Sequence, residues 1–222
     1  VAVQQNVSND VLLALRNGGT GGSGGPVGTP IYVLHVDNTA ASGGDGSVEH
    51  PLNFLPTSTG SNVDIVFVHS GNGTSTNMNH GIVMNDYQRL LGQGVPHVFT
   101  DTLGTFALPG YTPGQTIPSI TNITPGGNAV TLASHNEVSG FNIAFNTPGQ
   151  TNQGIAGSFI TDFNINNVNI TGAGNSTIVP PNGAAVQLIN ATGTGLITKS
   201  TFSNNKNADG VLVNNSFGGT LN

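Results

Sequence analysis

The chain has 222 residues, a formal net charge of −6 at pH 7 and no cysteine, and charged residues make up only 6% of it. Globular proteins usually contain about 25% charged residues, so this chain has too few to cover the wet faces of many amphipathic helices. It has no basic cluster for nucleic acid, no apolar stretch long enough for a membrane-spanning helix, and no disulfide or thiol chemistry. A neutral surface of Asn, Thr, Ser and Gly is typical of a bacterial surface or secreted protein, so we expect an extracellular or cell-surface location.

Residues 1–30 precede the main domain. An apolar run that includes Val11, Leu12 and Leu13 lies in residues 1–17, and residues 18–30 form a Gly-rich linker. Linkers of this composition are flexible tethers. We therefore expect residues 1–17 to pack on the same body or to add a strand to a neighbouring molecule.

The main domain, residues 31–222, is expected to be all-β. A cap segment (31–62) begins with a strand at 31–36, and coils follow in 63–95 and 129–222. Strands are predicted at 63–68, 81–84, 89–92, 130–132, 141–145, 155–160, 163–170, 186–189, 196–202 and 211–213. Similar pieces recur after about 24 to 32 residues, a period that predicts a parallel β-helix, or solenoid, whose strands stack about 4.8 Å apart.

A β-sandwich is the alternative fold for the same strand pattern. It is less favoured because no two-residue Asn-Gly turn joins two alternating strands. Residues 96–128 interrupt the rhythm with a long loop insertion rich in Gly, Pro and Thr. Loops of this length are usually flaps or functional insertions.

Three stretches carry a resemblance to a known family: HVDNTAASGGDGSVEHPLNFL, then VDIVFVHSG, then GIVMNDYQRLLGQG. They resemble the first coils of right-handed parallel β-helix proteins of the pectate-lyase-like superfamily, and are similar to passenger regions of large bacterial, autotransporter-like surface proteins. The resemblance covers 31–95, and 129–222 through the coil rhythm. It implies a β-helix of three sheets and functions that range from polysaccharide lyases and hydrolases to adhesins and surface fibres.

Catalytic chemistry is weakly indicated by the charged residues. A β-helix lyase needs an Arg or Lys base beside a calcium site, but we expect Arg89 to cover apolar surface with its stem and to pair with Asp86 or Asp64. A β-helix hydrolase needs carboxylates that converge from neighbouring coils. Asp162, Asp209 and Glu137 are far apart in sequence, and nothing in the sequence brings them together.

Two weaker binding sites are also predicted. Asp37, Asp45 and Glu49 stand in a Gly-rich loop that could hold Ca²⁺, although Asx-turns that close the loop explain the same residues. The histidines never occur as H-x₃-H, so a zinc site is unsupported. If the 96–128 insertion forms one side of a groove, then Tyr87, Phe106 and Tyr111 are candidate stacking platforms for sugar rings.

The favoured hypothesis is a non-enzymatic structural or adhesive β-helix, within a self-associating surface fibre or a larger passenger protein. The last coil, with Val211, Leu212 and Val213, has no capping element in the sequence. Exposed strand edges template pairing, so we expect self-association end to end or through residues 1–17. The alternative is a carbohydrate-binding or polysaccharide-degrading β-helix that acts on surface glycans. Neither hypothesis needs a cofactor other than the Ca²⁺ considered above.

Overall fold

The structure of the protein is a computed structural model that describes residues 31–101, 104–108, 110–145, 152–174, 184–205, 208–215 and 220. The side chains of 100, 101 and 104–106 are outside this description. Every regular element in these ranges is a β-strand, and none of these residues belongs to a helix that could cross a membrane.

The strands are short in the first coils and longer from β8 onward. Their bounds are β1 Val33–Val36, β2 Ile65–Val68, β3 Ile82–Val83, β4 Arg89–Gly92, β5 Val98–Asp101, β6 Gly104–Ala107, β7 Ser119–Ile120, β8 Asn128–Leu132, β9 Asn136–Ala144, β10 Gln153–Ser158, β11 Thr161–Thr171, β12 Ala184–Ile189, β13 Thr192–Thr198, β14 Thr201–Ser203 and β15 Asp209–Asn214. The predicted strands are therefore present with shifts of a few residues at their ends, except that the predicted strand 196–202 is divided between β13 and β14 at the left-handed Lys199.

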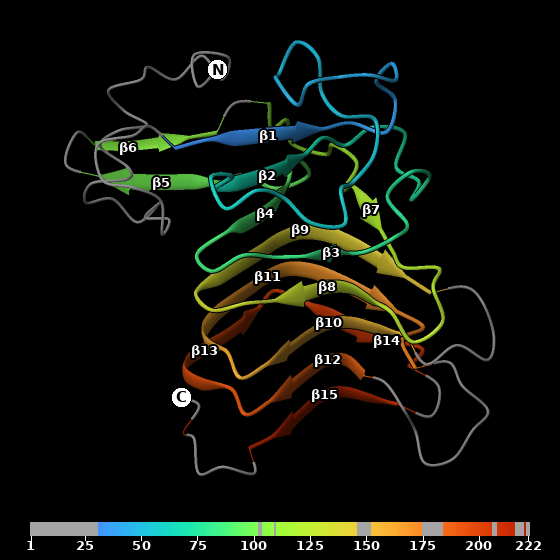
Figure 1. Ribbon diagram of the computed structural model, residues 1–222, viewed down its shortest axis with the longest axis vertical. Helices are drawn as coiled ribbons and strands as arrows, with labels where there is room; N and C mark the ends of the chain where they lie inside the picture. Colours follow the sequence, from blue (N-terminus) through green and yellow to red (C-terminus); the bar gives the residue numbers. More distant parts are fainter. Residues whose placement is uncertain are drawn as a thin grey trace.

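Two parallel sheets form the body, and successive strands alternate between them (Figure 1). The main sheet has the order β1-β2-β4-β9-β11-β13, with β14 beside β11 and β7 beside β9. The second sheet has the order β15-β12-β10-β8-β3. This arrangement confirms the predicted all-β parallel solenoid and excludes the antiparallel sandwich, because only β5 and β6 pair antiparallel among the described strands.

Stacked aliphatic side chains fill the inside of the solenoid. In the main sheet Val66, Leu90, Val138, Ile165 and Ile197 are in register on consecutive strands. A matching row in the second sheet consists of Ile82, Val130, Ile155, Val186 and Val211. Burying one such side chain stabilises the fold by about 1.5–3 kcal/mol, so the regular inward rows are what holds the coils in register.

The main-sheet strands bend where left-handed residues stack. Gly140, Asn167 and Lys199 are aligned by the register of β9, β11 and the β13–β14 segment, and their φ angles are 83°, 51° and 48°. Gly and Asn adopt this conformation most readily. The bend turns each strand around the core, and β9 and β11 are visibly curved in Figure 1.

The 96–128 insertion is only partly a loop. Strands β5 and β6 form an antiparallel hairpin that projects beside β1 (Figure 1), and β7 rejoins the main sheet beside β9. Phe99 and Leu108 anchor the hairpin to the outer face of the first coils, in a second apolar cluster with Ile31, Val33, Ile65, Phe67 and Leu91. The hairpin therefore stands as a wall on the outside of the main sheet.

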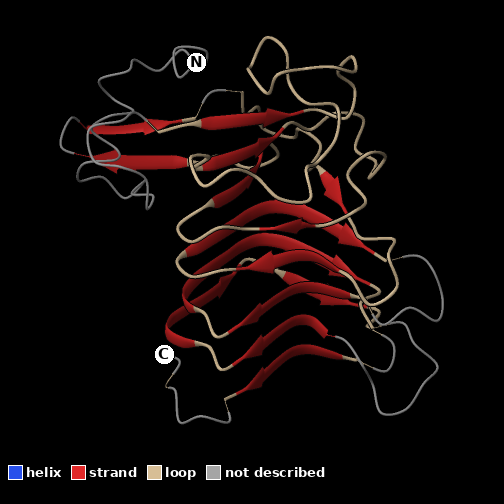
Figure 2. Cartoon of the chain, viewed as in Figure 1, coloured by secondary structure: helices blue, strands red, loops and turns tan. Residues whose placement is uncertain are grey.

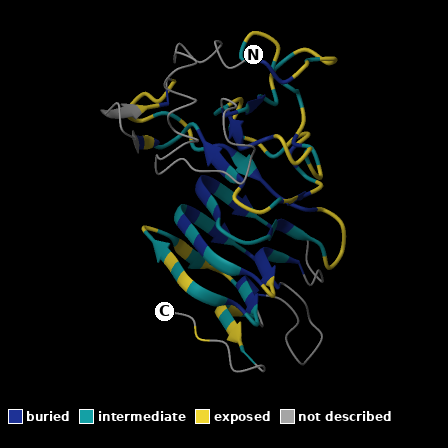
Figure 3. Cartoon of the chain, turned by 60° about the vertical axis from the view of Figure 1, so that its left-hand side comes forward, coloured by how far each residue is buried: buried dark blue, intermediate teal, exposed yellow. Residues whose placement is uncertain are grey.

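The cap segment closes the first end of the solenoid. The amide of His35 donates to the carbonyl of Gly46, and the amide of Leu52 donates to the carbonyl of His35. These bonds occupy the outer edge of β1, and the loops that make them gather at the top of Figure 2. The opposite end of the solenoid is more exposed to solvent, because residue exposure increases toward β13 and β15 (Figure 3).

Candidate functional site: a polar groove beside the hairpin

A groove of about 430 Å³ crosses the outer face of the main sheet where the hairpin leaves it. An adjoining hollow of about 480 Å³ continues it along the coils and shares two of its residues, Arg89 and Glu137. The groove is lined by Arg89, Val95, Pro96, His97, Val98, Phe99, Tyr111, Glu137, Ser139, Asn166, Asn167 and Lys199. The hollow is lined by Arg89, His135, Asn136, Glu137, Asp162, Phe163, Asn164 and Thr194.

Arg89 and Glu137 form an ion pair at the centre of this surface. Their register on β4 and β9 places Arg89 Nη1 3.4 Å from Glu137 Oε2. The guanidinium also lies over the ring of Phe99, 5.0 Å from its centroid. Burial lowers the pKa of Arg89, and the Glu137 carboxylate opposes that shift. The contact of Arg89 with Phe99 joins the hairpin to the groove floor, and the ion pair leaves little net charge at the centre of the groove.

Each predicted partner of Arg89 accepts a backbone amide, and the pairing of Arg89 with Asp64 or Asp86 stays a prediction. Asp86 Oδ1 accepts the amide of Ser134 at 2.9 Å, and Asp64 Oδ2 accepts the amide of Tyr32 at 2.6 Å. Sequence reasoning did not name Glu137 as the ion-pair partner, because the two residues are separated by the whole 96–128 insertion.

A column of three side chains follows the corner beside the hollow. The rings of Tyr87 and His135 stack with centroids 4.2 Å apart and planes 12° apart. His135 Nδ1 lies 3.2 Å from Asp162 Oδ2, and Asp162 Oδ1 accepts the amide of Thr194 at 2.6 Å. All three residues have positive φ angles. Sequence reasoning did not identify this column, although aligning the coils by their repeat would have placed His135 over Asp162.

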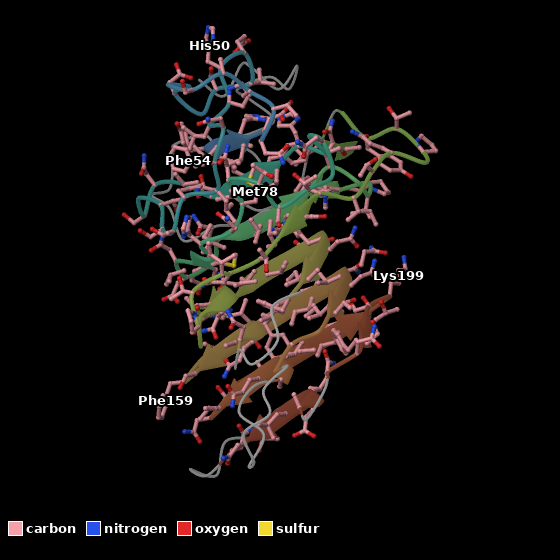
Figure 4. The ribbon with its side chains drawn as sticks, turned by 90° about the vertical axis from the view of Figure 1, so that its right-hand side faces the viewer. His50, Phe54, Met78, Phe159 and Lys199 are labelled. Carbon is pink, nitrogen blue, oxygen red and sulfur yellow. The ribbon has the colours of Figure 1, made fainter. Side chains whose placement is uncertain are left out.

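The remainder of the groove floor is made of neutral amides and hydroxyls. Asn166 Nδ2 donates to Thr198 Oγ1 at 2.9 Å, which links two neighbouring coils. Asn167 and Lys199 follow at the bend of the strands. Lys199 reaches outward from the body in Figure 4, on the opposite side from Phe159. The floor therefore offers amide and hydroxyl groups in rows, with one lysine at its margin.

The three predicted sugar platforms have different positions. Tyr111 lines the groove and is 37% exposed. Tyr87 is 40% exposed but has one face covered by His135. Phe106 belongs to β6, where its backbone is opposite Phe99, and its side chain lies outside the described residues. Of the three, Tyr111 is the residue that the structure brings into the groove.

The predicted calcium ligands lie in the cap segment, away from the groove. Asp37 Oδ1 accepts the amide and hydroxyl of Thr39 at 2.8 and 2.6 Å. Asp45 Oδ1 accepts the amide of Ser47 at 2.9 Å, and hydrogen bonds from the Ser47 hydroxyl and amide lower the pKa of Asp45. Asp37 and Glu49 line one hollow of about 310 Å³, without Asp45. No group of three metal-binding side chains occurs in the described ranges, and the calcium site stays a prediction.

The predicted assembly residues divide into two sets. Val11, Leu12 and Leu13 lie outside the described residues. The other three, Val211, Leu212 and Val213, lie in β15 at the edge of the second sheet. Val211 and Val213 are in register with the buried Val186 and Leu188, yet they are 42% and 46% exposed.

Comparison of the chain with protein-family models, with curated proteins and with solved structures finds no match in any of the three. The class of protein is therefore defined by the architecture: a parallel β-solenoid with a hairpin-walled polar groove on its main sheet.

Proposed function

We propose that this protein is a non-enzymatic, extracellular adhesive β-helix that binds carbohydrate along the groove. The observation that carries the proposal is the lining of the groove, which combines neutral amides, hydroxyls and one exposed aromatic ring. Sugar hydroxyls are neutral donors and acceptors, and binding sites are built from an apolar wall and a few convergent polar groups. Tyr111 supplies the ring, and Asn166 and Asn167 supply the amides.

The proposal also includes the handedness of the solenoid and the number of sheets that each coil contributes to. Parallel strands joined across a sheet wind right-handed in nearly all proteins, so we assign right-handed winding to the solenoid. The stacked bend in β9 and β11 supports three faces per coil, as the resemblance to pectate-lyase-like and passenger β-helices implies.

Binding without cleavage is favoured by the pairing of the charged groups in the groove. Glu137 is bound to Arg89, and Asp162 is bound to His135 and to the amide of Thr194. A glycosidase needs two carboxyl groups committed to the sugar, one of them as the proton donor. The groove carboxylates are instead engaged with protein groups.

Polysaccharide cleavage is the second candidate, because one observation favours it. Glu137 and Asp162, which are far apart in sequence, line the same hollow from neighbouring strands. Incubating the protein with a panel of polysaccharides and following reducing ends and ultraviolet-absorbing unsaturated products separates the two candidates. Product that disappears in both Glu137→Gln and Asp162→Asn would replace the adhesive proposal with an enzymatic one.

A glycan array followed by titration calorimetry tests the adhesive proposal. Tyr111→Ala is expected to weaken binding about tenfold or more, because stacked aromatic contacts contribute about 1 kcal/mol and bury area in addition. Phe159→Ala is the matched control, since Phe159 is 70% exposed and lies on the opposite side of the body from Lys199 (Figure 4). Absence of binding to every glycan, or equal binding by both variants, would refute the proposal.

Self-association is proposed for the end of the solenoid, where β15 is the edge strand of the second sheet. The support is the exposure of Val211 and Val213 at positions where the preceding strand is buried, together with the cap segment that occupies the edge of β1 at the other end. Sedimentation of the purified chain should show concentration-dependent assembly that Val211→Ser/Val213→Ser weakens. Removal of residues 1–30 tests the alternative contact through the first segment.

A further inference from the structure

Three histidines surround Phe67 in the seam between the main sheet and the hairpin. The ring of Phe67 lies 5.7 Å from His35, 5.2 Å from His69 and 6.2 Å from His97, all with edge-to-face geometry. Phe67 is 2% exposed, and Phe99 of the hairpin belongs to the same apolar cluster. The contact between the hairpin and the main sheet therefore contains a cluster of aromatic rings, and three of these rings are titratable imidazoles.

Hydrogen bonds connect these histidines to the chain on either side of the hairpin. His97, just before β5, contacts the carbonyl of Gly92 through Nε2 at 2.7 Å. The amide of Leu108, just after β6, donates to the carbonyl of His97 at 2.9 Å. His97 therefore ties both ends of the hairpin to the last residue of β4.

A second connection runs through Gln93. Its Nε2 donates to the carbonyl of Gly110 at 2.7 Å, and its Oε1 accepts the amide of Ser70 at 3.0 Å. A side-chain hydrogen bond joins Gln93 to His69, whose Nε2 is 2.9 Å from Nδ1 of His35. These contacts connect the His35–His69 pair, through Gln93, to the segment that follows the hairpin.

The paired imidazoles require at least one neutral ring. One nitrogen must accept the hydrogen bond, and two protonated rings would bring two N–H groups together. Burial, with the charge of His69 adding to it, lowers the pKa of His35 to about 3. Burial also lowers the pKa of His69, opposed by Asp37 and Gln93.

His97 has a comparable environment. Burial lowers its pKa, the Gly92 carbonyl opposes the shift, and Arg89 adds to it. The charged groups that face the seam are therefore Asp37 on one side and Arg89 on the other, and Arg89 is paired with Glu137.

We propose that the hairpin β5–β6 is released from the main sheet by acid, so that it acts as a pH-dependent wall of the groove. His69 and His97, whose pKa values are lowered by burial, are neutral while the hairpin is docked and gain protons when the seam opens. Opening is therefore favoured as the pH falls below about 6.5, the ordinary histidine value. The consequence for ligand release rests on the proposed carbohydrate function, whereas the opening itself does not.

Hydrogen exchange of the full chain, corrected for the intrinsic pH dependence of exchange, measures the opening directly. Each histidine that regains its ordinary pKa on opening raises the opening equilibrium by up to about tenfold per pH unit below 6.5. Amides of β5, β6 and Leu108 are expected to lose up to about 100-fold protection between pH 6.5 and 4.5 for each histidine that regains its ordinary pKa. Amides of β10 and β12, in the second sheet, should retain theirs.

Two substitutions in the seam make the test specific. His97→Gln preserves a donor for the Gly92 carbonyl and removes one titratable group, so the pH dependence of hairpin exchange should become shallower. His69→Asn is the second variant, with the same expectation if His97→Gln folds poorly. His50→Gln, in the exposed part of the cap segment, is the control and should behave as the parent chain.

Three results would overturn the proposal: hairpin protection that does not change between pH 7.5 and 4.5, simultaneous loss of protection in both sheets, or a pH dependence that both seam variants retain unchanged. Glycan binding is measured separately at each pH. If no glycan binds at any pH, the proposed function fails while the exchange result still decides the release of the hairpin.

Discussion

The ion pair between Arg89 and Glu137 yields the sharpest stability prediction. Glu137→Gln keeps the shape of the side chain and removes the charge that faces the guanidinium. The two side chains are 17% and 24% exposed, so the pair is intermediate between exposed pairs, worth up to about 1 kcal/mol, and buried pairs, whose rupture costs about 3–5 kcal/mol. We expect Glu137→Gln to lower the free energy of unfolding by about 2 kcal/mol.

The double-mutant cycle isolates that interaction. Arg89→Met keeps an apolar stem against Phe99, and we expect it to cost about 1–2 kcal/mol because Glu137 remains more accessible to water. The double variant should cost less than the two single changes together, by about 1–2 kcal/mol. Single costs that add within about 0.5 kcal/mol in the double variant would refute a stabilising interaction between Arg89 and Glu137.

Urea denaturation at equilibrium, followed by far-ultraviolet circular dichroism, measures all four proteins of the cycle. A change in midpoint with constant m-value reports stability alone. Glu49→Gln is the control, since Glu49 is exposed in the cap segment and should change stability by less than about 0.5 kcal/mol. The measurement is made in the presence of a chelator, so that any metal held by the cap segment does not contribute.

The remaining predictions concern backbone contacts, a buried amide and pH. In Gly92→Ala the new Cβ would meet the carbonyl oxygen of Gly140 at 2.0 Å, so thermal unfolding should show a loss of about 3 kcal/mol or more, whereas Gly210→Ala, with its nearest atom at 3.8 Å, should be neutral or stabilising by up to about 1 kcal/mol. Asn136 is 2% exposed and hydrogen-bonded to three backbone groups at 2.7–3.0 Å, so Asn136→Ala should cost about 3 kcal/mol or more in urea titrations. Burial, with the charge of His69 adding to it, lowers the pKa of His35 from its ordinary value of 6.5 to about 3, so the folded state binds fewer protons than the unfolded state. The contribution of His35 to stability should therefore fall by up to about 1.4 kcal/mol per pH unit as the pH drops from 6.5 toward 3. Urea midpoints between pH 7.5 and 4 that show the same slope for His35→Gln as for the parent chain would contradict this assignment.

Sequence reasoning located the strands because the inward rows are a local signal. Ile165 lies between Asn164 and Asn166 in an alternating pattern, and Val66 lies in the short apolar run 65–68. Both patterns indicate a strand from neighbouring residues alone. Strand β4 begins and ends where the pattern of residues 89–92 predicted. The insertion was harder to predict, since β7 has only two residues and joins the main sheet through pairing with β9.

The candidate site could not be assembled from the sequence in the same way. The prediction of sugar platforms identified Tyr111, which lines the groove, but did not include Asn166 or Lys199. These residues stand in stretches that look like ordinary coil positions. Only the register of β9, β11 and the following strands brings their side chains beside the hairpin.

The sequence by itself determined that the protein is a charge-poor solenoid of short parallel strands. Strand formation and inward packing depend on the spacing of apolar residues within each coil, which is a local property of the sequence. The tertiary structure decided which coils are neighbours across the 96–128 insertion, and hence that Arg89 meets Glu137. The physical reason is that stacking fixes partners through backbone register between strands, and a long insertion changes the sequence distance between partners without changing their distance in space.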